Sequence, residues 1–538
     1  MKRRQFIHLA SSLGAAMSIP AHAQSSTSQS GKNRAASKAA PDEKADILQL
    51  QQQMQGGQLS SVGLCRFYLE RIKRIDQHGP TLRSVLELNP EALAIAASMD
   101  AERKAGKVRG PLHGIPVLLK DNIATADKMK SSAGSLAIAH FPADRDAHIV
   151  AQLRAAGAVI LGKTNLSEWA NFRSTHAYSG WSARGGLTRN PYVLDRNASG
   201  SSSGSGAAAA AHLAVLCIGT ETDGSIVSPA SVCGVVGLKP TVGLLSRAGI
   251  VPIAASQDTA GPMTRNVMDA ALAMSAMASA DKDDAATLAR PAGLVTDFAA
   301  GLNKDGLRGV RIGVVRSMFG NHPQLTARIN EALEVMRAQG AIIVDPVELT
   351  PFDLAAELDV LLNEFKHGLN QYLPRYASRE PVQTLAQVIA WNRAHAKQEL
   401  AVFDQDIFER AESSPGVNSE GYLKAHAACL KATREDGIDR TLKQHQLDAL
   451  LAPTGDPAWL TDVVNGDRTG TSFSSHAAIA GYPHVSVPCG LVQGLPVSVS
   501  FVGTAWRDAA LLKMAYAYEQ ASLLRQAPKF LATLATSQ

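Results

Sequence analysis

The chain contains 538 residues, of which 45% are hydrophobic and 19% are charged, and this composition supplies a large core and excludes global disorder. The formal net charge is +5 at pH 7. Part of that charge lies in the first few residues, so the rest of the chain is close to neutral and has no basic block that would suggest a nucleic acid partner.

The N-terminus has the three parts of an export signal. Residues 2–4 are basic, residues 6–19 are weakly apolar, and residues 21–23 form a small-x-small cleavage site. We therefore expect a signal peptide over residues 1–23. The paired arginines followed by Gln and Phe resemble a twin-arginine signal, with an ordinary Sec signal as the alternative. Either route predicts a periplasmic or secreted protein, and the apolar stretch is too short for a stable membrane anchor.

The apolar pattern of the mature body predicts an α/β fold with a large mixed sheet surrounded by helices. Spacings of three and four indicate helices, and short apolar runs indicate buried strands. We expect helices over 43–76 (a pair joined near residues 56–57), 91–105, 266–280, 324–338, 352–375, 382–411, 419–445 and 507–523. We expect strands over 114–123, 212–220, 310–315, 340–344, 448–453, 484–490 and 496–503. Residues 146–165 read as a helix, a turn at Gly157 and a strand.

The domain organisation follows from where the chain has linker-like segments. Residues 24–43 are rich in Ser, Gln, Lys, Ala and Pro and predict a disordered leader. No internal repeat and no clean linker follows, so we expect residues 44–538 to form a single domain. The helical run over 352–445 has the length of a lid or cap over a site.

The cysteines give no sign of a metal site. The chain has five, without a CxxC motif or a paired histidine: Cys65, Cys217, Cys233, Cys429 and Cys489. An oxidising compartment would permit a disulfide. The odd count and the apolar surroundings favour buried free thiols.

Lys120 ends the apolar segment GIPVLLKDNI, residues 114–123. A lysine in this position either reaches water or lies desolvated, and desolvation lowers its pKa towards neutrality. A neutral lysine is able to act as a base. The residues alone leave open a surface lysine beside Asp121.

In residues 195–215, DRNASGSSSGSGAAAAAHLAV, a Gly- and Ser-rich stretch runs directly into an alanine-rich one. A linker separates folded units and has polar ends, whereas this stretch meets an apolar segment. Glycine permits close backbone approach, and a helix beginning near Ser203 would point its free N–H groups at the loop. A phosphate cradle is disfavoured because the P-loop pattern is missing.

Residues 218–241, IGTETDGSIVSPASVCGVVGLKPT, combine a strand with a polar turn. Ser225 follows Asp223 and Gly224, and a tight turn exposes such a serine beside backbone N–H groups that bind a developing oxyanion. Taken alone, an ordinary turn serine is the alternative.

Together these segments resemble the amidase signature hydrolases. The matching stretches are GIPVLLKDN (114–122), GSSSGSGAAAA (200–210), residues 219–252 and SQDTAGPMTR (256–265), which occur in the order of that family. The resemblance covers about residues 60–270 strongly. It continues weakly to the C-terminus through LLAPTGDP and GYPHVSVPCG.

The resemblance implies a Ser–cis-Ser–Lys hydrolase with the amidase signature fold, without a cofactor or metal. Lys120 corresponds to the base, Ser201 to the bridging serine and Ser225 to the nucleophile. Ser201 rather than Ser202 is assigned because it lies 24 residues before Ser225 and follows Gly200, and the family implies a cis bond at that Gly–Ser peptide. The oxyanion hole is expected to consist of the backbone N–H groups of Thr222, Asp223, Gly224 and Ser225.

Two departures from the family pattern refine the expected substrate. The family commonly reads GGSSGG and GGSIR, where this chain has SGSSSG (199–204) and DGSIV (223–227). Lost arginine and gained aspartate disfavour an amidotransferase role. The segments ETDGSIV, SEWANFRS and SGWSARGGLTRNP look most like peptide amidases, which release ammonia from the C-terminal amide of peptides.

A peptide substrate requires an extended groove. We expect its wall to include Asp223, Trp169, Asn171, Phe172 and Trp181, with core packing as the alternative for each aromatic ring. A general aryl or aliphatic acylamidase is the second candidate. An amidotransferase component is disfavoured by the export signal, and a non-catalytic binding module by the complete set of catalytic residues. The sequence leaves the oligomeric state open.

Overall fold

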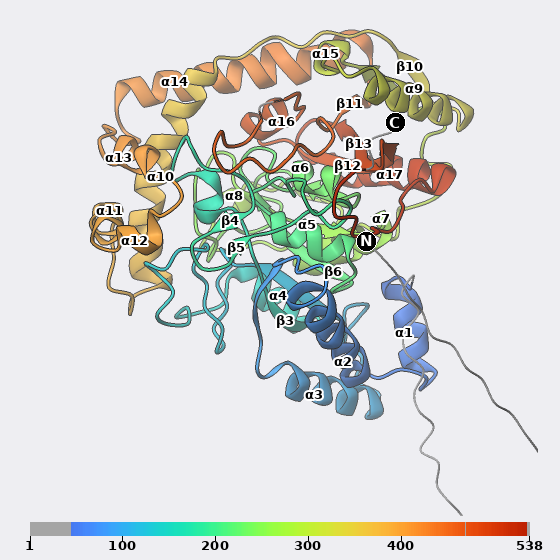
Figure 1. Cartoon of the computed structure of the whole chain (residues 1–538). Helices are drawn as coiled ribbons and strands as arrows, with labels where there is room; N and C mark the ends of the chain where they lie inside the picture. The colour runs from blue at the N-terminus through green and yellow to red at the C-terminus, as the bar shows by residue number, and fades with distance from the viewer. Residues whose placement is uncertain (1–44, 469, 535–538) are drawn as a thin grey trace, which may run out of the picture. The chain divides into compact units, whose positions relative to one another are not determined.

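An eleven-stranded mixed sheet forms the centre of the fold, in the order β1-β3-β2-β6-β8-β7-β12-β13-β11-β9-β10 (Figure 1). The computed structural model describes residues 45–468 and 470–534, so the predicted signal peptide (1–23) and leader (24–43) lie outside the described residues. The strands are β1 (Val85–Leu88), β2 (Pro116–Lys120), β3 (Val159–Thr164), β6 (Leu216–Glu221), β7 (Val236–Lys239), β8 (Thr259–Thr264), β9 (Arg311–Val314), β10 (Ile342–Val344), β11 (Ala449–Pro453), β12 (His484–Val492) and β13 (Leu495–Val502), with a separate pair β4 (Trp181–Ser182) and β5 (Gly186–Leu187). The predicted α/β class and mixed sheet are confirmed.

Strand direction determines where functional side chains meet. β2 is parallel to both β3 and β6, whereas β8, β7, β12 and β13 follow as antiparallel neighbours. Leu119 of β2 pairs with Ile218 of β6. The carboxyl ends of these two strands, Lys120 and Glu221, therefore lie at the same edge of the sheet.

Helices cover both the sheet and its edges. They are α1 (Ile47–Gln55), α2 (Ser61–Arg71), α3 (Ala92–Lys104), α4 (His148–Ala155), α5 (Ser203–Ala210), α6 (Val227–Val232), α7 (Val267–Met277), α8 (Ala285–Leu288), α9 (Pro323–Ala338), α10 (Leu354–Tyr376), α11 (Leu385–Ala394), α12 (Ala396–Glu399), α13 (Asp406–Glu412), α14 (Glu420–Thr433), α15 (Asp439–His445), α16 (Ser475–Ile479) and α17 (Asp508–Ser522). α5 packs on β2, β6 and β8, and α9 and α17 pack on β12 and β13. None of the described helices is both long and apolar enough to cross a membrane.

Several sequence predictions need correction. β7 and β8, in the middle of the sheet, were not predicted, because VGLK and TAGPMT are short and contain Gly and Pro rather than alternating β-branched residues. The strand predicted from residue 212 begins at Leu216, since His212 has a left-handed backbone. The helix predicted over 382–411 is interrupted between Glu399 and Asp406, where Phe403 turns inward and packs on Trp181.

The alanine-rich stretch is a buried helix rather than a linker. α5 has the sequence SGSGAAAA, and every residue in it is buried. A Cβ at Gly204 would overlap the backbone oxygens of Ser84 and Asn165, and one at Gly206 would lie 3.0 Å from Pro229 O. Small residues thus allow the helix to pack closely behind the nucleophile and bridging segments.

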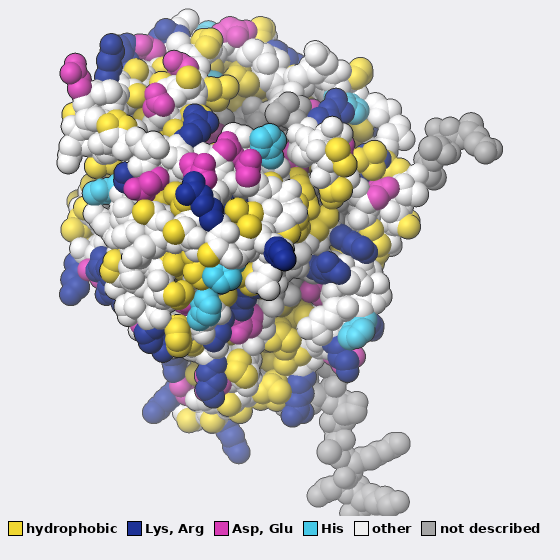
Figure 2. Space-filling view, turned by 60° about the vertical axis from the view of Figure 1, so that its left-hand side comes forward, with side chains coloured by type: hydrophobic (Ala, Val, Ile, Leu, Met, Phe, Trp, Pro, Cys, Tyr) yellow, Lys and Arg dark blue, Asp and Glu magenta, His cyan; other side chains and the backbone are white. Residues whose placement is uncertain are grey.

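The helices α10 to α15, here called the cap helices, form the region predicted as a lid or cap (Figure 1). α10 packs on α11, α13 and α14. Its Phe365 ring lies 5.1 Å from the ring of Phe172 in the core segment and 5.1 Å from that of Phe408 in α13. Figure 2 turns the side of Figure 1 that carries these helices forward and shows acidic and basic side chains next to one another on it.

The cysteines agree with the sequence prediction. All five are buried and free, and burial raises the pKa of the thiols, for example that of Cys489 to about 12. Such protonated thiols are unreactive packing groups.

Candidate active site

Lys120, at the end of β2, is fully buried. Its Nζ donates to Ser201 Oγ (2.7 Å), and to Thr220 Oγ1 (2.9 Å) and O (3.2 Å). Burial lowers the pKa of Lys120 from 10.5 to about 7, and the carboxylates of Glu221 and Asp258 oppose this shift. The neutral amine and the ammonium are therefore both populated near neutral pH, as reversible proton transfer requires.

The structure distinguishes the two candidate bridging serines. Ser201 follows a cis peptide bond at Gly200–Ser201 and contacts Lys120. Ser202 instead donates from Oγ to Thr220 O (2.9 Å) and accepts from Thr220 N (3.1 Å). Ser201 is therefore the serine in direct contact with the lysine, and Ser202 holds the end of β6 against the loop.

Ser225 lies in the turn between β6 and α6 (the nucleophile turn, residues 221–227) and is 9% exposed. Its carbonyl accepts from Ser202 N (3.1 Å), which ties the turn to the bridging loop. Gly224, directly before it, has a φ of 73°, a left-handed value that favours glycine. The Ser225 hydroxyl has no hydrogen-bond partner among the described residues, so Lys120 and Ser201 are joined directly whereas Ser225 is held beside them through its backbone.

Glu221 shapes the nucleophile turn from inside. Its buried carboxylate accepts from the backbone amides of Gly224 (3.0 Å), Ile226 (2.7 Å) and Val227 (3.0 Å). The Gly224 amide, predicted as an oxyanion donor, is thus already engaged. The amides of Thr222, Asp223 and Ser225 have no acceptor among the described residues and are the remaining candidate donors.

Sequence reasoning missed Glu221, although a signal was present. An acidic residue in the last position of a strand, directly before a glycine-containing turn, is placed to accept the turn's free amides. Burial raises the pKa of Glu221, whereas the nearby Lys239 ammonium and the amide hydrogen bonds lower it.

A second buried carboxylate, Asp258, holds the turn from outside. It accepts from Thr222 Oγ1 (2.6 Å) and from the backbone amides of Ile253 (2.8 Å) and Ala254 (3.0 Å). Burial raises the pKa of Asp258 to about 6. Asp258 lies just before β8, a strand that was not predicted, so no sequence pattern connected it with Thr222.

The structure assigns packing contacts to the aromatic residues predicted for the substrate wall. Trp169 is 1% exposed, and its ring lies 5.5 Å from that of Phe408. Trp181 packs on Phe403 (5.0 Å between ring centroids) and lies near the buried Arg173 guanidinium. Together with the Phe172 contact described above, these rings join the core to the cap helices, so the alternative of core packing holds for all three.

Asp223 and Asn171 remain as polar candidates for substrate contact. Asp223 Oδ2 accepts from Ser475 Oγ (2.6 Å), which links the nucleophile turn to α16. Asn171 Nδ2 donates to Ser179 Oγ (2.9 Å). The Oδ1 atoms of both residues are buried without a partner among the described residues, and such acceptors are available to a ligand's N–H groups.

Two grooves differ in their relation to these residues. One, of about 1170 Å³, is lined by Ser228, Trp459, Asp462, Ser472 and Leu495 among others. Ser228 begins the first turn of α6, and its Oγ lies 2.8 Å from Ser199 Oγ of the bridging loop, so this groove reaches the nucleophile turn.

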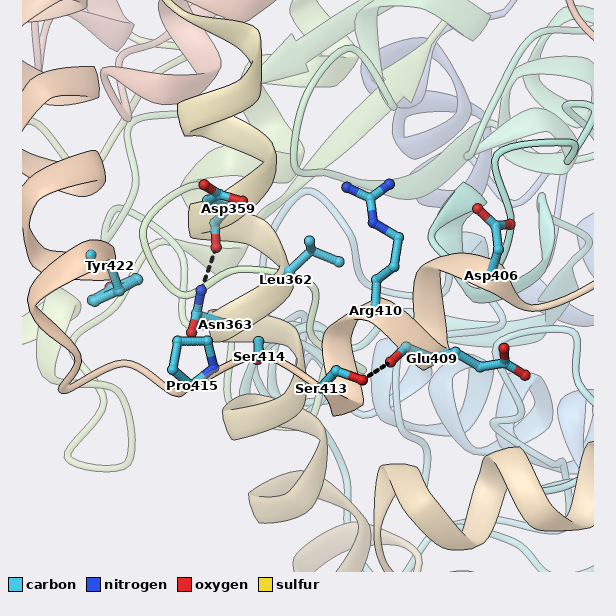
Figure 3. A pocket seen from close by; sticks show the side chains of 11 residues that line it. Asp359, Leu362, Asn363, Asp406, Glu409, Arg410, Ser413, Ser414, Pro415 and Tyr422 are labelled. Atoms are coloured by element: carbon cyan, nitrogen blue, oxygen red, sulfur yellow. Dashed lines mark hydrogen bonds between the residues drawn. The ribbon is translucent and has the colours of Figure 1, made fainter.

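The other groove, of about 690 Å³, lies among the cap helices (Figure 3). Asp359, Asp406, Glu409, Arg410 and Tyr422 line it, and no predicted site residue does. A surface group of His176, Asp404 and Asp406 has the spacing to hold a metal ion, but its carboxylates accept from Ser174 and Thr175. Neither feature shares a residue with the candidate site.

Known proteins share both the sequence and the fold. A family model described as Amidase matches residues 64–512. The native peptide amidase from Stenotrophomonas maltophilia is 50% identical, with a TM-score of 0.87 over 90% of this chain and 99% of that one. A probable amidase from Arabidopsis thaliana is 40% identical over 488 residues, which cover 88% of this chain and 89% of the relative. A putative amidase from Arthroderma benhamiae is 36% identical over 496 residues, covering 88% and 81%.

The match spans the strand that ends in Lys120, the loop of Ser201, the nucleophile turn and most of the sheet beyond them. The chain therefore belongs to the amidase family, the amidase signature hydrolases, and is an enzyme that hydrolyses amide C–N bonds.

Proposed function

We propose that the protein hydrolyses the C-terminal carboxamide of peptides and releases ammonia, with Ser225 as nucleophile, Ser201 as proton bridge and Lys120 as base. The observation that carries the mechanism is the buried contact between Lys120 Nζ and Ser201 Oγ (2.7 Å), at a lysine whose pKa burial lowers to about 7. A neutral amine in hydrogen-bond contact with a serine is suited to proton transfer.

In the proposed reaction, Ser225 Oγ loses its proton to Ser201 Oγ as it attacks the amide carbon, and Ser201 passes its own proton to Lys120. The free amides of Thr222, Asp223 and Ser225 stabilise the oxyanion. The Lys120 ammonium then returns a proton through Ser201 to the leaving nitrogen, and the C–N bond breaks to give ammonia and an acyl-enzyme. Water attacks the ester by the same proton route and restores Ser225.

The proposed substrate class is supported by the groove that reaches Ser228 and by similarity to a peptide amidase. That relative also has a structure in complex with the competitive inhibitor chymostatin. An aryl or aliphatic acylamidase with the same three residues is the alternative. Similarity to glutamyl-tRNA(Gln) amidotransferase components, at 33% identity over 501 residues for the one from Thermosynechococcus vestitus, leaves an ammonia-supplying role as a further outcome of the test below.

The test measures ammonia release from peptide amides, amino-acid amides and anilides, with and without Ser225→Ala. We expect the highest kcat/KM on peptide amides and no measurable hydrolysis by Ser225→Ala. Activity on anilides alone would contradict the proposed substrate, and full activity in Ser225→Ala would contradict the mechanism.

A matched pair of variants tests the proton bridge. Ser201→Ala removes the hydroxyl that contacts Lys120, whereas Ser202→Ala removes one that binds only the backbone of Thr220. We expect Ser201→Ala to lower kcat by about 10² to 10⁴-fold and Ser202→Ala to lower it much less. Equal losses in both variants would assign Ser201 a structural role.

A further inference from the structure

Two carboxyl groups lie beside the nucleophile turn and take no part in the proton route. Asp223 belongs to the turn itself, and its Oδ2 accepts from Ser475 Oγ (2.6 Å). Glu357 comes from the first turn of α10, is 5% exposed, and accepts from Gln257 Nε2 (3.3 Å). Burial, followed by the charge of Asp223, raises the pKa of Glu357 to about 8, so the two carboxyl groups lie close enough to interact.

Buried acceptor atoms around this pair have no hydrogen-bond partner among the described residues. They are Asp223 Oδ1, Gln257 Oε1 and Asn122 Oδ1. Gln257 precedes Asp258, which holds Thr222, and Asn122 donates to Thr220 Oγ1 (2.9 Å), so both lie at the turn. Leaving a buried acceptor without a donor is unfavourable. A primary carboxamide offers two N–H donors, whereas a carboxylate offers none.

The buried cations around the turn are already engaged. Lys239 Nζ donates to Tyr482 O (2.7 Å), and Arg247 Nε donates to Asp284 Oδ2 (2.8 Å). Lys120 is occupied by the hydrogen bonds described above and is partly neutral near pH 7. A carboxylate at the nucleophile would therefore lose its hydration and meet like charge without a compensating ion pair.

We propose that Asp223 and Glu357, here called the acidic pair, determine specificity by charge: they accept N–H groups of a neutral carboxamide and exclude a carboxylate from the same position. The inference rests on the proposed function to the extent that amide substrate and acid product occupy one site. Hydrolysis converts a donor-bearing neutral group into an anion, so the acidic pair favours release of the product acid. Specificity arises here from repulsion of the wrong ligand as well as attraction of the right one.

The test compares the inhibition constant (Ki) of an acid with the KM of its amide. The pair consists of the amide that the wild-type enzyme hydrolyses best and the acid produced from it. The variants are Asp223→Asn and Glu357→Gln, which keep the shape of each side chain and remove its charge. Asp359→Asn is the matched control, because Asp359 lies on the same helix but lines the outer groove (Figure 3).

For the wild-type enzyme we expect the Ki of the acid to exceed the KM of the amide by about tenfold or more, as like charges at an effective dielectric near 20 imply. Each acidic-pair variant is expected to lower that Ki several-fold, with a smaller change in the KM of the amide. The control is expected to change neither value.

Equal Ki and KM in the wild-type enzyme would overturn the inference without the need for any variant. An unchanged Ki in both variants, or the same fall in the control, would also overturn it. The proposed function fails by a different result, namely the lack of any hydrolysed peptide amide. In that case, the best non-peptide amide and its acid still decide the role of the acidic pair.

Discussion

The ionisation of Lys120 is expected to control the pH dependence of the enzyme. Its pKa falls from 10.5 to about 7 on burial, which corresponds to about 5 kcal/mol at 1.36 kcal/mol per pKa unit. If the neutral amine is the base, kcat/KM rises about tenfold per pH unit below pH 7 and levels off above it. Measuring kcat/KM on a peptide amide from about pH 5.5 to 9 tests this.

Substitution of Lys120 tests the same reasoning by a second route. Lys120→Met is expected to lower kcat/KM by about 10² to 10⁴-fold. Lys120→Arg is expected to be equally inactive, because a guanidinium stays protonated in proteins. A pH profile that is flat across this range, or an active Lys120→Arg enzyme, would refute the assignment of Lys120 as base.

The same shift predicts how Lys120 affects stability. The folded pKa lies below the unfolded one, so charging this lysine costs stability. The full cost is present below about pH 7 and disappears as the pH rises to 10.5. Relative to wild type, Lys120→Met is therefore expected to be more stable at about pH 6 than at about pH 9 by about 3 kcal/mol. Urea unfolding at both values measures this, and a difference of the opposite sign would contradict the pKa shift.

Four further predictions concern other contacts. Glu221→Gln places an NH2 group towards the amides that Glu221 now accepts and is expected to lower kcat by about tenfold or more while the fold, followed by circular dichroism, is retained. Gly204→Ala is expected to destabilise by about 1–3 kcal/mol because its Cβ meets backbone oxygens, whereas Gly301→Ala, with open space around it, is expected to be neutral. Arg173→Met leaves the buried Glu168 and Glu399 without their cation and is expected to cost about 3–5 kcal/mol in chemical unfolding. We also propose export by the twin-arginine route, so replacing Arg3 and Arg4 with lysine is expected to leave the enzyme in the cytoplasm on cell fractionation.

The sequence identified the residues whose chemistry conflicts with their surroundings. A lysine at the end of an apolar strand, a Ser- and Gly-rich stretch against alanines, and a serine after Asp-Gly each carry a local signal, and the structure joins Lys120 to Ser201 as expected. The buried helix beginning at Ser203 was also predicted, because small residues and glycine indicate close packing.

What escaped prediction depends on contacts between distant segments. Asp258 reaches Thr222 only because β8 pairs with β6 in the sheet, and β8 contains a proline that argues against a strand. Trp169, Phe172 and Trp181 have the composition of a binding wall. Their burial comes from Phe365, Phe403 and Phe408 of the cap region, more than 180 residues further along the chain.

Mass spectrometry of a peptide amide before and after incubation with the enzyme tests the central claim most directly. The account predicts that the wild-type enzyme converts the amide into the full-length peptide acid, with the corresponding change in mass and release of ammonia. Ser225→Ala is expected to leave the amide intact. Shorter fragments from the wild-type enzyme, or conversion by Ser225→Ala at the wild-type rate, would contradict it.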